Sequence, residues 1–361
     1  NGVRSGRIDR EETIMRDGDN QRPVGRRGHR HAPASAHSVR RMWPVVLLAI
    51  AVATLTVQQL TVAAQNGTRA GAPPASRGRP DFHGNWKFST VTPLQRPAEL
   101  AGKARFESDE EAKAYAKRAA LNLDRDPPPG DPGTYNQFWI DAGDSVTKSL
   151  RTSLIVDPPD GRIPALTPEA QKRLAATVER TKVNANPEDR SLYERCILGF
   201  NAGPPIIPGP YNNIMQIVQT DDYVGLITEM VHDARLVPVK GITPPGVPQW
   251  KGNSTGRWEG DTLVIESQHF RADGTGTISF RPATDGNLRL TERLRLLDRD
   301  TLEYQFTVDD PTVWTKPWTA IVEMSRTGEQ IFEFACHEGN HAMIGMLGGA
   351  RAQERAGLVP R

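Results

Sequence analysis

The chain has 361 residues, with 45 Lys and Arg against 43 Asp and Glu and a formal net charge of +2 at pH 7. The basic excess lies in residues 1–42, where ten Arg and five acidic residues stand among almost no large apolar side chains. The rest of the chain therefore carries about −3. A weakly acidic body of this kind argues against nucleic acid as a partner.

Residues 43–64 form a charge-free apolar run that follows two arginines and ends at Ala64. This order is typical of a cleaved signal peptide. A membrane anchor is the alternative, but Gln58 and Gln59 interrupt the run after about 15 residues, short of the roughly 20 that span a bilayer. We expect cleavage after Ala64, no stable membrane span afterwards and a secreted, periplasmic or extracellular protein. Residues 1–42, which lack the apolar residues of a core, are then a disordered or non-native upstream segment.

The remaining chain is predicted to form a linker and one mainly β domain. The expected parts are a small-residue and proline linker over 65–80, an irregular, partly helical front over 81–210, a β meander over 211–340 and a tail over 341–361. Ser108 with Glu111 forms a capping box before one helix of the front, and Thr167 with Pro168 opens another. The tail is predicted to contain a weak helix.

From Ile214 onward, short runs alternate apolar and polar residues between turn signals, which is the pattern of β-strands. The runs are IMQIVQT, YVGLITEM, ARLVPV, TLVIESQHF, TGTISFRP, NLRLTERLRLL, TLEYQFTV, WTAIVEMS and IFEFACH. No helix intervenes between them. The sequence therefore predicts an antiparallel meander that either closes into a barrel or folds into a sandwich.

The chain contains two cysteines, Cys196 and Cys336. In an exported protein, two cysteines pair as a disulfide more often than they form a catalytic or metal site. A bridge between them would close a loop of about 140 residues and contribute roughly 4 to 5 kcal/mol in the chain-entropy model.

Residues 337–341, HEGNH, match the H-E-x-x-H pattern of zinc metalloproteases. On a helix, that spacing places His337 and His341 on one face to bind a divalent metal such as zinc, with Glu338 as general base. The context favours a coincidental match, because the motif follows a predicted strand and its middle residues, Gly and Asn, are poor helix formers.

A second polar cluster, EMVHDAR, ends a predicted strand at residues 229–235. His232 beside Asp233 has the composition of a general base with an orienting carboxylate, and Glu229 lies close in sequence. Joined with His337 and Glu338, it would form a hydrolase or lyase site or a mononuclear metal site. The alternative is a structural network in which Arg235 pairs with Glu229 or Asp233.

Trp314 and Trp318 flank Lys316 and Pro317. Two such rings form either an aromatic wall for a ligand or part of the core. Arg235 is the polar residue we expect to face a ligand in the binding alternative.

Several longer segments carry a resemblance to a known group of proteins. They are PDFHGNW at 80–86, RTSLIVDPPDGRIPALTPEAQKR at 151–173, YNNIMQIVQT at 211–220, EMVHDAR at 229–235, GRWEGDTLVIES at 256–267, TVDDPTVWTKPWTA at 307–320 and ACHEGN at 335–340. In these segments the chain resembles a family of secreted proteins of environmental bacteria such as acidobacteria, a family with no assigned activity. The GNW opening and the GRWEGDTLVIES hairpin also resemble lipocalin-type barrels, which implies an apolar ligand pocket.

The function predicted from the sequence is binding of a small apolar or aromatic molecule in a β-barrel pocket. The alternative is a hydrolase or lyase at His232, Asp233, His337 and Glu338, and zinc metalloprotease activity ranks last. The two main hypotheses differ in what the pocket must contain, since a binding site is mostly apolar and an enzyme needs titratable groups converging on a void.

Overall fold

The computed structural model describes residues 78–123, 140–183, 186–241, 246–271 and 286–358. The predicted upstream segment, the signal peptide and most of the linker lie outside the described residues, as does the predicted strand TGTISFRP at 275–282. No helix among the described residues is long and apolar enough to cross a membrane.

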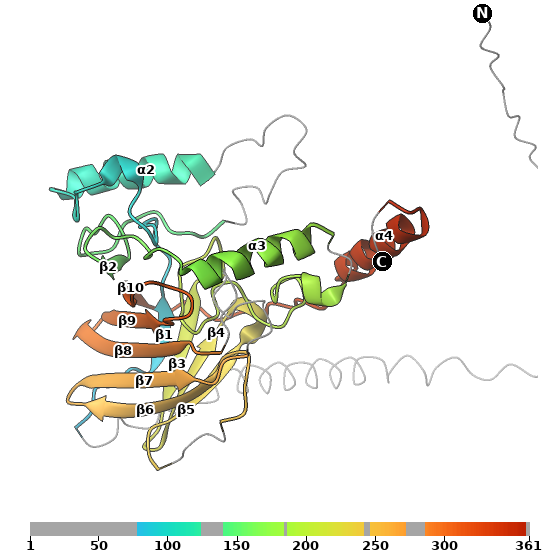
Figure 1. The fold of residues 1–361 in the computed structure, drawn as a ribbon. Coiled ribbons are helices and arrows are strands. Elements are labelled where there is room, and N and C mark those ends of the chain that lie inside the picture. Colours follow the sequence, from blue (N-terminus) through green and yellow to red (C-terminus); the bar gives the residue numbers. More distant parts are fainter. Residues whose placement is uncertain (1–77, 124–139, 184–185, 242–245, 272–285, 359–361) are drawn as a thin grey trace, which may run out of the picture. The chain divides into compact units, whose positions relative to one another are not determined.

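The fold is mainly β, as predicted, and its centre is a ten-stranded antiparallel sheet (Figure 1). The strands are β1 (Gly84–Lys87), β2 (Ile155–Asp157), β3 (Ile214–Gln219), β4 (Tyr223–Thr228), β5 (Ala234–Pro238), β6 (Asn253–Glu259), β7 (Thr262–Gln268), β8 (Arg289–Asp298), β9 (Thr301–Asp309) and β10 (Trp318–Thr327). Their order is β5-β4-β3-β1-β10-β9-β8-β7-β6, and β2 pairs with β10 beside β1. Strand β1, far away in sequence, thus joins the two halves of the meander.

The sheet does not close into a barrel, which was one of the two forms that the pattern predicted, the other being a sandwich. Within the described residues, β5 and β6 form no backbone pairing, so the ladder is open between them. Valine side chains of β5 and of the residue after it nevertheless approach the β6 backbone, because a Cβ placed on Gly256 of β6 would lie 2.8 Å from Cγ1 of Val239 and 3.0 Å from Cγ1 of Val237. The absence of a side chain at Gly256 lets the two edge strands approach without a shared ladder.

Alternating residues of each strand fill the core on one face of the sheet. The large side chains that are less than 2 % exposed include seven aromatic residues, namely Trp86, Trp318, Tyr304, Phe82, Phe88, Phe270 and Phe306. The inner face is thus packed with large side chains. Polar residues of the same strands, such as Lys87 and Arg293, alternate with these and face outward.

The predicted helices are confirmed. Helix α2 (Asp109–Leu123) begins with the Glu111 N–H donating to Ser108 Oγ at 3.2 Å, and α3 (Pro168–Val183) begins with Ala170 N–H donating to Thr167 Oγ1 at 3.1 Å. The tail forms α4 (Ala342–Arg355). Short 3-10 turns lie at Ala98–Leu100, Pro187–Asp189 and, directly after β4, at Met230–His232, which is labelled η5.

The predicted strand IFEFACH at 331–337 was wrong, because residues 331–335 form no regular secondary structure and Cys336 and His337 lie in a turn. Phe332 is 67 % exposed, and its N–H donates to Glu229 Oε1 at 3.2 Å instead of to a neighbouring strand. Strand β6 was missed as a separate strand, since its sequence NSTGRWE is mostly polar.

Candidate functional site

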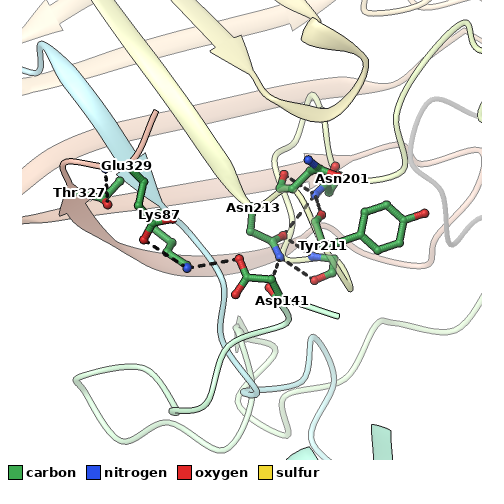
Figure 2. Close-up of polar contacts among 9 residues, drawn as sticks. Lys87, Asp141, Asn201, Tyr211, Asn213, Thr327 and Glu329 are labelled. Atoms are coloured by element: carbon green, nitrogen blue, oxygen red, sulfur yellow. Dashed lines mark hydrogen bonds and ion pairs between the residues drawn. The ribbon is translucent and has the colours of Figure 1, made fainter. Parts of the chain in front are cut away.

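Lys87 is the central charged residue of a polar cluster on the outer face of β1 (Figure 2). Its neighbour Trp86 points into the core, so the alternation of the strand directs Lys87 outward. The Lys87 Nζ lies 3.2 Å from Asp141 Oδ2 and 3.5 Å from Glu329 Oε1. Partial burial works against the charged ammonium, but the two carboxylates outweigh it and raise the pKa of Lys87. Lys87 is therefore a protonated cation at neutral pH.

Asp141 is held in place through its backbone. The fully buried Asn213 donates from Nδ2 to the Asp141 carbonyl and to the Gly209 carbonyl, both at 2.8 Å. Asn213 Oδ1 accepts from Gly209 N–H at 2.8 Å and from Asn201 Nδ2 at 3.2 Å. The Asp141 N–H donates to the Pro210 carbonyl at 2.7 Å. Every polar group of the Asn213 amide is thus used to fix the backbone around Asp141 (Figure 2).

A pocket of about 310 Å³ adjoins this cluster. Its lining consists of Lys87, Ser89, Ala120, Ile140, Asp141, Ala142, Gly143 and Asp144. Gly143 has φ +91°, and a Cβ there would lie 3.0 Å from the Thr90 backbone nitrogen, so only glycine lets this loop approach β1 so closely. Asp144 forms no ion pair among the residues that the structure describes. The lining therefore carries two carboxylates and one ammonium, and the ammonium is already shared with Glu329.

A second, more apolar pocket of about 320 Å³ meets the first one at Asp144. It lies between α2 and residues 144–150, and its lining includes Ala112, Ala116, Val146 and Leu150. Charged residues occur there in balance, with Asp109 and Asp144 against Lys113 and Lys148. A third pocket of about 330 Å³ lies on the outer faces of β7, β8 and β9. Its lining is mostly polar and shares no residue with the first two pockets.

The predicted cluster at 229–235 is divided among different surroundings. Asp233 pairs with Lys251, whose Nζ also donates to the Ala234 carbonyl at 2.7 Å. Burial raises the pKa of Asp233, although Lys251 and Arg235 act in the opposite direction. His232 is exposed in the η5 turn, where it has φ +38°. Neither His232 nor Asp233 lines any of the pockets described above.

Arg235 faces the interior of the sheet and not a ligand pocket. Its Nη2 donates to Glu292 Oε1 at 2.7 Å, and its Nη1 donates to the other carboxylate oxygen. The Tyr304 hydroxyl donates to Glu292 Oε1 at 2.6 Å and accepts from the Ile206 N–H at 3.0 Å. Burial, followed by the charge of Glu292, raises the pKa of Tyr304 well above its usual value. The predicted partners of Arg235, Glu229 and Asp233, are replaced by Glu292.

Buried Glu229 of the first predicted cluster accepts from the N–H of Phe332, which lies five residues before His337 of the second cluster. His337 and Glu338 lie exposed in a turn, and His341 is the N-cap of α4. The H-E-x-x-H residues thus do not share a helix face. Among the described residues, no three His, Cys, Asp or Glu side chains are arranged to hold a metal ion.

The two tryptophans lie in the core, and the two cysteines are bonded to each other. Trp314 and Trp318 are 2 % and 0 % exposed, and their rings pack edge to face at 5.9 Å in the core. The packing therefore favours the core interpretation over an aromatic ligand wall. The predicted Cys196–Cys336 disulfide is confirmed.

No protein-family model matches the chain, and a search of curated proteins finds none that is similar to it. Lys87, Asp141 and Asp144 were not predicted from the sequence. The one local signal was the outward position of Lys87 directly after the GNW motif.

Proposed function

We propose that the protein binds a small molecule in the pocket formed by Lys87, Asp141 and Asp144. The observation that carries this proposal is a pocket of about 310 Å³ in which the Asn213 network fixes the backbone of Asp141 in advance. Preformed concave sites with a few polar groups are the usual form of small-molecule sites. A fixed wall also reduces the ordering cost of binding.

The lining indicates the chemistry of the ligand. Ala120, Ile140 and Ala142 offer apolar contact, and the second pocket beyond Asp144 extends that apolar surface. The carboxylate of Asp144, which forms no ion pair with a described residue, favours a cationic or hydrogen-bond-donating group and disfavours an anion. An apolar or aromatic body carrying an amine meets both requirements, in keeping with the apolar ligand expected from the sequence.

We also propose that the chain is an exported member of the secreted family it resembles. The run that resembles a signal peptide supports export, and so does the Cys196–Cys336 disulfide, which joins residues 140 positions apart in the sequence. The close approach of Val237 of β5 to the Gly256 backbone of β6 supports a relation to lipocalin-type barrels. The proposed site differs from theirs, because it lies on the outer face of β1 and the inner face is filled by aromatic side chains.

The enzyme alternative has less support. Asp233 is engaged with Lys251, and His232, His337 and Glu338 are exposed side chains away from the described pockets. A general base has to lie within hydrogen-bond reach of a bound substrate. We therefore rank binding above hydrolase, lyase or zinc-dependent chemistry.

The proposal can be tested with three probes that share one aromatic body, namely phenethylamine, 2-phenylethanol and 3-phenylpropionate. Isothermal titration calorimetry is expected to give the tightest binding for the amine and the weakest for the carboxylate. Asp144→Asn is expected to weaken binding of the amine about tenfold, the equivalent of one charge-assisted hydrogen bond. Asp261→Asn, at an exposed turn between β6 and β7, is the matched control. Equal affinities of both variants, or no binding of any probe, would refute the proposal.

A further inference from the structure

The segment that follows β10 runs across an aromatic cluster close to the proposed site. Phe334 stacks on Tyr211 with a ring separation of 6.4 Å and an interplanar angle of 17°. Tyr211 in turn packs edge to face on Phe200 at 5.2 Å, and its hydroxyl is 2.8 Å from that of Tyr193. We name Tyr193, Phe200 and Tyr211 the aromatic cluster and residues 331–341 the strap.

Among the residues that the structure describes, few contacts other than the disulfide hold the strap. Its Phe332 N–H is bonded to Glu229, and Asn340 Nδ2 donates to the Cys336 carbonyl within the strap and lies 3.6 Å from Cys196 Sγ. Most of its side chains are exposed. The Cys196–Cys336 bond is the covalent tie between the strap and the loop that carries the aromatic cluster. A segment with so little buried apolar surface opens locally at low free energy once its crosslink is lost.

The aromatic cluster is connected to the pocket by a short series of hydrogen bonds. Asn201 Nδ2 donates to the Tyr211 carbonyl at 3.0 Å and to Asn213 Oδ1 at 3.2 Å. Asn213 then donates to the Asp141 carbonyl. The Asp141 N–H is bonded to Pro210, next to Tyr211 in the chain. The backbone position of Asp141 thus depends on the loop that the strap covers.

We infer that the Cys196–Cys336 disulfide makes the pocket redox-sensitive, because it holds the strap on the aromatic cluster and thereby keeps Asp141 in position. A dithiol reductant would supply the two electrons. One of its thiolates attacks a cystine sulfur, the S–S bond breaks and a mixed disulfide forms. The second thiol of the reductant resolves that bond, which leaves two cysteine thiols in the protein and an oxidised reductant.

This inference concerns the position of Asp141, and its effect on ligand affinity rests on the proposed function. Its primary test is therefore independent of any ligand. Hydrogen exchange of the full chain is measured by mass spectrometry before and after reduction with dithiothreitol, and in Cys196→Ser/Cys336→Ser. Exchange is expected to accelerate at least about tenfold in peptides covering 140–144 and 209–214. Peptides of β8 and β9 serve as the internal control and should be unchanged.

A matched pair of variants distinguishes the effect of losing the ring contact with the aromatic cluster from the effect of removing any aromatic side chain of the strap. Phe334→Ala removes the ring that stacks on Tyr211 and should accelerate exchange in the same two peptides with the disulfide intact. Phe332→Ala removes a ring that is 67 % exposed and should leave them unchanged. If the double Ser variant fails to fold, this pair still tests the strap.

The outcomes distinguish the inference from the proposed function. Accelerated exchange in both peptides, together with weaker binding of phenethylamine to the reduced protein, supports both. Accelerated exchange without amine binding to either form supports the strap and counts against the proposed function. Unchanged exchange in 140–144 and 209–214 after reduction overturns the inference, whatever the binding data show.

Discussion

Replacing Arg235 by Met is expected to lower the free energy of unfolding by about 3 to 5 kcal/mol at pH 7, because it leaves a buried carboxylate without its counter-ion. Glu292 is 0 % exposed and the Arg235 side chain 10 % exposed, so water cannot solvate the remaining charge. Tyr304 would still donate one hydrogen bond to Glu292, which offsets part of the cost. The large effect follows from the position of this pair, which joins edge strand β5 to β8 across the interior of the open sheet.

Urea unfolding followed by tryptophan fluorescence measures this effect, and two further variants test the explanation. Arg235→Met/Glu292→Gln removes the orphan charge while retaining an acceptor for Tyr304, so it should be about 2 kcal/mol more stable than the single variant. Arg293→Met breaks an outward pair with Glu259, in which both side chains are more than a third exposed, and should cost less than about 1 kcal/mol. If Arg235→Met costs no more than Arg293→Met, or if the double variant is as unstable as the single one, the reasoning is wrong.

Three other predictions follow from single positions. Gly84→Ala should destabilise by about 1 to 3 kcal/mol in urea unfolding, because Gly84 has φ +124°, whereas Gly328→Ala, with open space around it, should be nearly neutral. The folded-state pKa of Asp233 is raised, so the free energy of unfolding of the protein relative to that of Asp233→Asn should be highest below pH 3.8 and should fall as pH rises through the folded-state pKa. An advantage of the protein over Asp233→Asn that grows with pH would contradict the raised pKa. Asn213→Ala should cost about 1 to 3 kcal/mol, since it leaves the part-buried N–H and carbonyl of Gly209 without their partner, and an unchanged melting curve would exclude the network.

Elements with strong local signals were predicted well. The caps at Ser108 and Thr167 lie within three residues of the groups they bond, so the sequence contains the whole motif. The alternation in 301–308 and 318–325 likewise needs no long-range information. The disulfide followed from counting cysteines in an exported chain.

Predictions that depended on distant partners were less successful. The alternation of IFEFACH is that of a strand, but a strand also requires a free sheet edge, and β10 already pairs with β9 on one side and with β1 and β2 on the other. Strand β1 has only four residues and gains its place through register with β3 and β10. Closure of the sheet likewise depends on whether the two edge strands, β5 and β6, can form backbone hydrogen bonds with each other.

The candidate site was not predictable, because it joins residues that are far apart in sequence. Lys87, Asp141 and Glu329 come from three separate segments, and the side chain that orders them, Asn213, comes from a fourth. The residues at 229–235 were adjacent in sequence and looked like a site for that reason. The tight η5 turn separates them, with Val231 and His232 both at positive φ.

Chemical-shift mapping tests the central claim most directly. The oxidised, ¹⁵N-labelled protein is titrated with phenethylamine, and the backbone amide shifts are followed. We predict that the largest changes fall on Lys87, Ala120 and residues 140–144, and that Asp144→Asn moves the midpoint of their titration to an about tenfold higher phenethylamine concentration. Changes concentrated at 229–235 or 337–341, or saturable binding that leaves 140–144 unperturbed, would contradict it.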